Sequence, residues 1–451
     1  MSTAVYTSSS PETLGAYIEG LTEPAWLTGI RRDALERFSR LPWPSARDEE
    51  FRRTDLSSFD FESWGFSRGE GSPAPEGAAP AAGSAPGEIA FEGASLAGRY
   101  LDPELAGKGC LLLSFDEIAA GALPEKVARS VAAALRKGLD RADNRLALWH
   151  YVTMTHGAVL YVPPFLELQE PFRVTFNETA SGGAQGASEI MRAPQVVVIA
   201  DEGARFSLLH QSDTDVSGEI LFNEGIILDL ARGSKVDYFL FQDVNIDSSF
   251  FSNSYASVGS DATLRVYSAV FGGLLSKYRM EGEMAGPGGD AFFGGIYFPH
   301  QDQHVDLRTV QDHRAPKAHS LALYKGAVAD EARSVFQGLI KVDHDALDTD
   351  AYLTNNNLVL GDEAEADSIP MLEINTDQVR CSHGSTTGKL DARQLFYLET
   401  RGYTPKESRR ILIEGFFAEV SASFPREARE RIEAIVDSRI PVEDESNGAM
   451  A

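Results

Sequence analysis

The sequence predicts a mainly β protein, built around a parallel β-helix (a β-solenoid) that lies between helical N- and C-terminal segments. Between about residues 158 and 378, short runs of Val, Ile, Leu, Phe and Tyr alternate with turns of Gly, Asp, Asn or Ala. These turns recur at a nearly fixed spacing. Helical patterns with recognisable caps occur before and after this region but not within it.

The spacing of the turns is the strongest sign of a solenoid. Strand–turn–strand units have their turns near residues 203, 233, 261, 289, 317 and 345, so the first step is 30 residues and each later step is 28. A propeller blade needs about 40–45 residues, and a sandwich has no reason to repeat. Stacked β-strands with one rung per repeat fit this period best.

The segment 1–155 is predicted to be an N-terminal helical domain. Ser10 is placed to cap a helix that has Pro11 at its first position. A second apolar stripe, which includes Val127, Val131 and Leu135, predicts a helix within residues 123–150. Residues 69–88 are rich in Pro, Ala and Gly and are predicted to be a flexible linker. The β-helix core is placed at residues 156–384.

The segment 385–451 is predicted to be a C-terminal helical domain. Asp391 can cap a first helix that Gly402 would end, and Thr404-Pro405-Lys406-Glu407 is a capping box that starts a second. The apolar face of the second helix includes Leu412, Phe416 and Phe417. These side chains either pack against the solenoid or bind a partner, and the pattern alone leaves both open.

Composition narrows the class of partner and the compartment. Lys and Arg number 41 and Asp and Glu 67, which gives a net charge of −26 and argues against binding to nucleic acid or to an anionic membrane. No apolar run reaches the roughly 18 residues that a membrane helix needs. The first residues lack the pattern of a secretory signal. With only two cysteines, we expect a chain of the reducing cytoplasm.

Cys381 and His383 are the candidate site residues. They stand in Arg-Cys-Ser-His-Gly (380–384), and on an extended strand two side chains at this spacing point to the same side. Thiolate and imidazole are ligands that iron, zinc and copper accept. Because two ligands do not complete a tetrahedral site, the pair indicates catalysis or a metal site that another chain completes. The alternative is a buried small cysteine beside a hydrogen-bonded histidine.

A second group of histidines comprises His300, His304 and His313, interspersed with Asp302, Asp306 and Asp312. Asp and His this close can bind a divalent ion. The segment has the texture of strands and turns, so a structural role is favoured.

Several motifs together resemble the SufB/SufD family of iron–sulfur cluster assembly proteins. They are Ser-Val-Phe-Gln-Gly (334–338), Thr-Asp-Ala (349–351), Asn-Asn-Asn-Leu (355–358), Cys-Ser-His-Gly (381–384) and Leu-Phe-Tyr-Leu (395–398). The segment 48–56 is similar to the family's N-terminal segment. Within the family the chain is most like SufD: Asp367-Ser-Ile-Pro370 lacks the cysteine that SufB carries there, and Gly384 replaces the glutamate that follows the SufB histidine.

The resemblance implies a right-handed parallel β-helix and a scaffold subunit without catalysis of its own. It implies assembly with SufB through the β-helix and with the ATPase SufC through the C-terminal helices, which gives Leu412, Phe416 and Phe417 a partner-binding role. His383, with Cys381 beside it, would hold a transient iron–sulfur cluster shared with SufB. A reduced flavin in the complex and a homodimer of the chain alone are left open.

Two other functions are compatible with a β-helix. One is a polysaccharide lyase or hydrolase, which needs paired carboxylates in an open groove. The other is a homodimeric structural protein that joins sheet to sheet.

Overall fold

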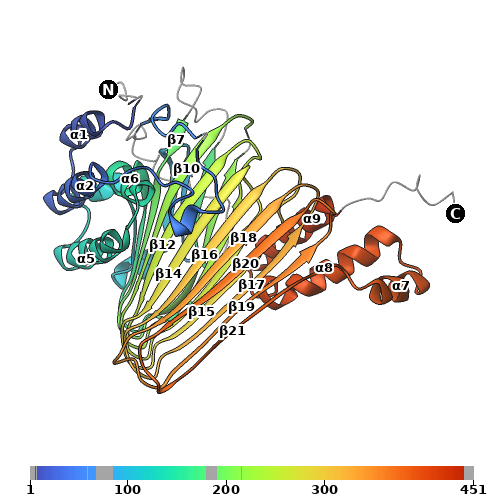
Figure 1. The fold of residues 1–451 in the computed structure, drawn as a ribbon. Helices are drawn as coiled ribbons and strands as arrows, with labels where there is room; N and C mark the ends of the chain where they lie inside the picture. The colour runs from blue at the N-terminus through green and yellow to red at the C-terminus, as the bar shows by residue number, and fades with distance from the viewer. Residues whose placement is uncertain are drawn as a thin grey trace.

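The computed structural model describes residues 6, 8–57, 59–67, 85–178, 190–214 and 216–440. Two long sheets face each other in it and extend along a common axis (Figure 1). The first sheet runs in the order β20-β18-β16-β14-β12-β10-β8-β5-β4. Its strands are β4 (Leu111–Ser114), β5 (His156–Val162), β8 (Pro194–Ala200), β10 (Ile220–Leu230), β12 (Ser249–Val258), β14 (Leu275–Met284), β16 (His304–His313), β18 (Arg333–Val342) and β20 (Glu365–Ile374). The short strands β1 (Gly65–Phe66) and β7 (Ile190–Arg192) join it at one side.

The second sheet runs in the order β21-β19-β17-β15-β13-β11-β9-β6-β2-β3. Its strands are β2 (Gly87–Glu92), β3 (Ser95–Leu101), β6 (Phe172–Glu178), β9 (Arg205–Thr214), β11 (Lys235–Asp243), β13 (Thr263–Val270), β15 (Asp290–Tyr297), β17 (His319–Val328), β19 (Thr349–Val359) and β21 (Val379–Gly388). Because the chain alternates between the sheets from β8 onward and neighbouring strands are parallel, each consecutive pair of strands is one rung of a solenoid. The prediction of a parallel β-solenoid is confirmed.

The register reproduces the period seen in the sequence. Lys235 pairs with Arg205, 30 residues earlier, and with Thr263, 28 residues later. Left-handed backbone occurs at most of the predicted turns, with positive φ at Gly203, Gly233 and Asp261. Glycine and aspartate are among the residues that adopt this conformation most readily.

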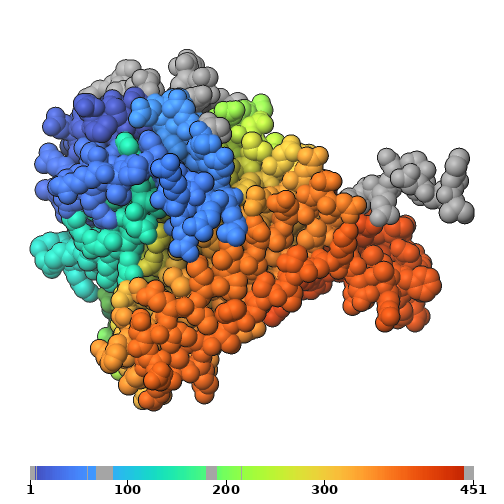
Figure 2. Space-filling view, in the orientation of Figure 1, coloured from blue at the N-terminus to red at the C-terminus, as the bar shows by residue number. Residues whose placement is uncertain are grey.

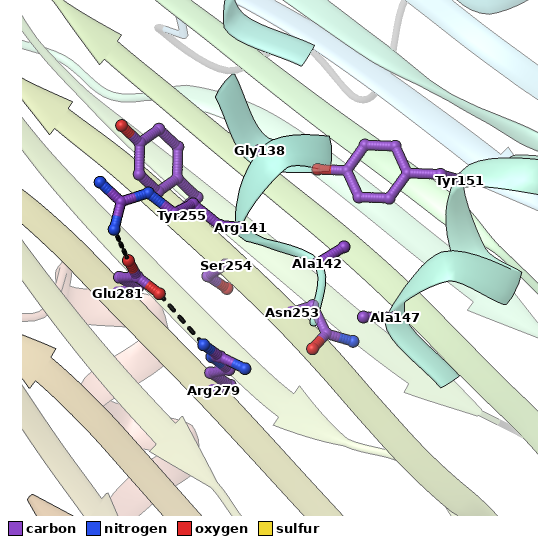
Figure 3. Close-up of a pocket in the computed structure, with 10 residues that line it drawn as sticks. All are labelled: Gly138, Arg141, Ala142, Ala147, Tyr151, Asn253, Ser254, Tyr255, Arg279 and Glu281. Atoms are coloured by element: carbon purple, nitrogen blue, oxygen red, sulfur yellow. Dashed lines mark hydrogen bonds and ion pairs between the residues drawn. The ribbon is translucent and has the colours of Figure 1, made fainter. Parts of the chain in front are cut away.

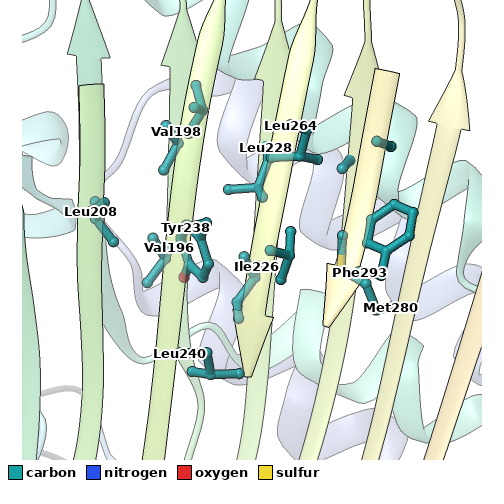
Figure 4. Packing of buried hydrophobic residues seen from close by; sticks show 14 of the residues in the cluster. Val196, Val198, Leu208, Ile226, Leu228, Tyr238, Leu240, Leu264, Met280 and Phe293 are labelled. Atoms are coloured by element: carbon teal, nitrogen blue, oxygen red, sulfur yellow. The ribbon is translucent and has the colours of Figure 1, made fainter. Parts of the chain in front are cut away.

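The interior of the solenoid is a continuous apolar core between the two sheets. Figure 4 shows Val196, Ile226 and Leu228 of the first sheet facing Leu208 and Tyr238 of the second. Each repeat contributes such side chains, and each rung buries them against the next. Stacking of rungs therefore supplies the stability that one rung could not have alone.

Helices cover the outer face of each sheet over part of its length. The first group lies on the outer face of the first sheet, where its apolar side chains meet Met191, Val197 and Phe251. It consists of α1 (Pro11–Gly20), α2 (Ala25–Phe38), the short η1 (Glu49–Phe51), α4 (Phe115–Ala119), α5 (Glu125–Arg141) and α6 (Arg145–Thr153). The short α3 (Pro103–Gly107) instead buries Leu105 in the interior core. The second group is α7 (Ala392–Thr400), α8 (Pro405–Ser421) and α9 (Arg426–Arg439). Among these, α8 and α9 pack on the outer face of the second sheet.

The segment 1–155 is less helical than predicted. Within it β2 pairs with β6, β3 with β2 and β4 with β5, so residues 87–114 extend both sheets. The parallel stacking of the first sheet begins at β5, close to the predicted residue 156, and the last strand of the core continues to Gly388. Most of the predicted linker, residues 69–84, lies outside the described residues; its end forms the start of β2. None of the described helices is both long and apolar enough to cross a membrane.

Candidate functional site at the open end of the solenoid

Cys381 and His383 lie on β21, the last strand of the second sheet. Their backbone partners on β19 are Ala351 and Leu353, which are both buried in the solenoid interior. Parallel pairing without a register shift keeps side chains on the same face from strand to strand. Both side chains of the pair are therefore on the inward side of β21; the spacing predicted that they share a side, but not which side it is.

The Cys381 thiol is half-buried and packs against the interior core. Burial is the main cause that raises the pKa of this thiol; a backbone hydrogen bond with Ala351 lowers it in part, and the negative charge of Asp350 adds a smaller increase. A thiolate is therefore disfavoured in the chain alone. A metal ion or a positive charge would have to be brought to Cys381 before it could act as a ligand.

His383 is exposed, in contrast to Cys381. Its neighbours on the same side of the strand, Ser385 and Thr387, are also exposed, because β21 is the terminal strand of the second sheet in the part of the chain that the structure describes. Across the described residues, no three or more His, Cys, Asp and Glu side chains gather closely enough to hold a metal. The pair thus offers two donors, one soft and one borderline, facing an open edge.

The partner strand of this last rung, β20, also exposes apolar side chains. Leu372 and Ile374 are aligned with Ile340 and Val342 of the interior core, yet they are 41% and 38% exposed. Pro370 lacks a backbone N–H, which a terminal strand tolerates. In Figure 2 the orange surface of the last rungs is covered by neither the blue N-terminal residues nor the red C-terminal helices. An unpaired edge with exposed apolar side chains is typical of a surface that binds another chain.

The structure corrects the partner-binding prediction for Phe417. This ring is 1% exposed and packs, with Ile413 and Val420, on the outer face of the second sheet. The ring centroid of Phe298, which directly follows β15, lies 6.4 Å from that of Phe417. Phe417 is therefore part of the core of this chain and cannot meet a partner without leaving it.

Leu412 and Phe416 remain partly accessible on α8. Both are half-buried. The Lys325 ammonium lies 5.0 Å from the ring centroid of Phe416 and forms an ion pair of 2.7 Å with Glu419. The ring of Phe416 is thus held between the sheet and solvent.

Three exposed aromatic residues near the end of the molecule were not among the predicted site residues. Phe396 and Tyr397 on α7 are 67% and 57% exposed, and Tyr403 in the turn before α8 is 46% exposed. No residue of α7 is buried, and the helix projects away from the solenoid (Figure 1). The signal that could have identified them is the pair of adjacent aromatic residues within a predicted helix. The apolar positions of this helix do not follow the pattern of the solenoid repeats.

The three histidines of the second candidate cluster are in separate environments. His300 Nδ1 is 2.7 Å from Gln303 Oε1, and His313 Nε2 is 2.8 Å from Ser320 Oγ inside the solenoid. His304 Nε2 lies 3.3 Å from the Thr54 hydroxyl on the outer face of the first sheet. The favoured structural role agrees with these hydrogen bonds.

A small cleft elsewhere lies between the N-terminal helices and the first sheet (Figure 3). Arg141 of α5 forms ion pairs there with Glu281 at 2.7 Å and Asp312 at 2.8 Å, and it also contacts Glu283. Arg279 contacts Glu281 from the other side. These contacts join the helices to the sheet, and they lie on its outer face, apart from the inward side chains of the last rung.

Comparison with known proteins gives the chain its family. Residues 183–416 match the family model described as "SUF system FeS cluster assembly, SufBD core domain". An iron–sulfur cluster assembly SufBD family protein of Mycobacterium leprae is 36% identical over 207 residues, which are 44% of this chain and 53% of that protein. The iron–sulfur cluster assembly protein SufD of Escherichia coli is 33% identical over 195 residues, covering 43% and 46%.

A longer match extends over nearly the whole chain. The iron–sulfur cluster assembly protein SufD of Bacillus subtilis is 23% identical over 464 residues, which cover 96% of this chain and 98% of that protein. In the more similar relatives the match spans only about half of their length. The family model covers the solenoid from β7 to the last rung, together with α7 and most of α8, which is more than half of the 451 residues. The chain belongs to the SufBD family of iron–sulfur cluster assembly proteins, as its motifs predicted.

Proposed function

We propose that this chain is a SufD-like scaffold subunit that contributes one half of a nascent cluster site to an interface with SufB. The observation that carries the proposal is the position of Cys381 and His383 on the inward side of β21, the terminal strand of the second sheet, which among the described residues pairs only with β19. Two donors at an open edge need further ligands from outside the chain. The iron–sulfur cluster is the cargo of this site, held during assembly and then released.

The assignment to SufD rather than SufB rests on particular residues. The stretch Asp367–Pro370 on β20 has no cysteine, and Gly384 follows His383. Cys110, the other cysteine of the chain, is buried near the opposite end of the solenoid, where burial raises its thiol pKa to about 12. In our proposal SufB supplies the missing ligands across the interface.

In our proposal, the protonated Cys381 thiol needs a positive charge that is brought to it at the interface. Because burial and Asp350 raise the thiol pKa, the chain alone keeps the proton on sulfur. Iron brought to His383 at the interface would place positive charge beside the thiol and favour its deprotonation. His383 is thus the first ligand in this proposal, and Cys381 the second.

The C-terminal helices are the proposed docking site for the ATPase SufC. Phe396 and Tyr397 project on α7, and Leu412 and Phe416 of α8 are partly exposed. Aromatic side chains of this kind commonly form the central contacts of protein interfaces. The chain itself would then be non-catalytic, with ATP-driven movement supplied by SufC. We place the assembly in the cytoplasm.

The direct test is the variant His383→Ala in a complex reconstituted with SufB and SufC. We expect the iron and acid-labile sulfide bound per complex to fall about tenfold, because one ligand is lost. Cys381→Ser should have a smaller effect. His344→Ala is the matched control, since His344 is 88% exposed on a turn of the same solenoid. Wild-type iron and sulfide content in His383→Ala, with subunit composition unchanged, would overturn the site.

A further inference from the structure

An N-terminal strap, residues 49–56, crosses the outer face of the first sheet toward its open end. Phe51, Thr54 and Leu56 of this segment are 3%, 1% and 4% exposed. The strap is far in sequence from the strands that it contacts. Figure 2 shows the blue N-terminal surface adjoining the orange surface of the last rungs.

The first half of the strap is tied to β14 and β18 through one backbone carbonyl. The carbonyl oxygen of Glu50 accepts hydrogen bonds from Lys277 Nζ at 3.1 Å and from Gln337 Nε2 at 3.0 Å. The Lys277 ammonium also lies 4.7 Å from the ring centroid of Phe51. Because Lys277 and Gln337 are almost completely buried, these contacts satisfy groups that would otherwise be costly to bury.

The second half of the strap is tied to β16 and β20. The Thr54 hydroxyl donates to the buried carboxylate of Asp306, which also accepts from Lys277 Nζ at 2.6 Å. Arg53 Nε lies 3.4 Å from Asp367 Oδ2 on β20. The same Asp367 oxygen accepts from Arg333 on β18 at 2.8 Å. One short segment thus contacts four neighbouring strands, and the last of them is the terminal strand of the sheet.

The terminal strand has fewer means of support than the others. Among the described residues β20 has a strand neighbour on one side only, and Leu372 and Ile374 are 41% and 38% exposed. Such an edge opens more readily than the strands inside the sheet. Asp367 therefore joins β20 both to its neighbour β18 and to a segment from the opposite end of the chain.

We propose that Arg53 and Thr54 are positioning residues, which hold the terminal rung in the register that presents its edge and the Cys381–His383 pair to the partner. This inference rests on the proposed function for its consequence in cluster assembly, but its structural claim concerns the chain alone. Arg53 acts directly on β20. Thr54 acts through Asp306 and the strap backbone.

The structural claim is tested by hydrogen exchange on the full chain without partners, iron or sulfide. We expect Arg53→Ala to accelerate amide exchange across β20 about twofold to fivefold, as for the loss of a half-exposed ion pair. Thr54→Val keeps the side-chain shape and removes the hydroxyl, and we expect roughly tenfold acceleration. Exchange in β10, far from the strap, should not change. Arg52→Ala is the matched control, because Arg52 is the exposed neighbour in the same strap.

The positioning role is tested by cluster loading in the complex with SufB and SufC. Arg53→Ala should reduce iron content several-fold, and the conservative Arg53→Lys should restore both loading and β20 protection. Unchanged exchange in β20, or equal acceleration in β10, would refute the strap as a local support. Faster exchange with normal loading would refute the positioning role. If the wild-type complex loads no cluster, the proposed function fails while the exchange experiment still decides the structural claim.

Discussion

Cys381 and His383 differ in their surroundings although only Ser382 separates them on β21. The thiol packs against the interior core, whereas the imidazole is exposed at the open end. The i, i+2 spacing in the sequence was enough to predict that both point to one side. It could not predict the difference in burial, because that depends on where the last rung ends and on which side chains of β19 lie beneath it.

The reactivity of the two cysteines provides a test at the residue scale. Burial and Asp350 raise the Cys381 thiol pKa above its usual 9.0, and burial raises that of Cys110 to about 12. Because the thiolate is the reactive form, alkylation of Cys381 by iodoacetamide should accelerate about tenfold per pH unit from pH 7 to 9. Cys110 should stay unmodified until the chain unfolds. Mass mapping of both sites over this range is the measurement, and a Cys381 rate that levels off below pH 8 would contradict the raised pKa.

The C-terminal helices were predictable in position but not in orientation. Asp391 caps α7, and Thr404 with Glu407 forms the capping box of α8, as predicted. Phe416 and Phe417 follow one another, and successive helix positions differ by about 100°, so only one can face the sheet. The sequence contained no information on which one would, because the outer face of the second sheet is assembled from distant rungs such as those of Phe298 and Leu323.

Truncation to alanine should affect stability at one phenylalanine of the C-terminal helices and partner binding at another. Phe417→Ala removes a ring buried against the second sheet and should lower the free energy of unfolding by about 3–5 kcal/mol. Phe396→Ala removes a ring that is 67% exposed and should change it by less than about 0.5 kcal/mol. Phe396→Ala should instead weaken SufC binding. Urea unfolding and a SufC binding titration measure the two effects, and a large stability loss in Phe396→Ala would contradict this division.

At the scale of the whole molecule, the repeat predicted the solenoid because every rung solves the same packing problem. Residues with left-handed backbone at the turns and buried side chains at alternating positions are local signals that recur. The strands β2 to β4 were missed because they have no such repeat and lie beside a Pro- and Ala-rich stretch. The strap was missed for a different reason: its partners Lys277, Asp306 and Asp367 are more than 200 residues away, and no local pattern encodes such contacts.

Buried histidines make the stability of the whole fold depend on pH. His156 and His313 lie in the solenoid interior, where burial lowers their pKa values from 6.5 to about 3 and about 4. Below about pH 6.5 these histidines bind protons in the unfolded chain but stay neutral in the folded chain. Their contribution to the free energy of unfolding is therefore complete above this pH and decreases as the pH falls. Between pH 7.5 and 5.5 each histidine should cost about 1.4 kcal/mol, and the two together about 3 kcal/mol.

Substitution of His313 isolates its share of this loss from that of other groups. In His313→Gln the side chain no longer titrates, so the fall in unfolding free energy between pH 7.5 and 5.5 should be smaller than in the wild type by about 1.4 kcal/mol. The absolute stability of the variant does not affect this test, because the quantity compared is the change in unfolding free energy between the two pH values (the slope). Urea titrations of the wild type and the variant at the two pH values measure this difference, and equal slopes in the two proteins would mean that the His313 imidazole takes up a proton within the folded solenoid as readily as in the unfolded chain.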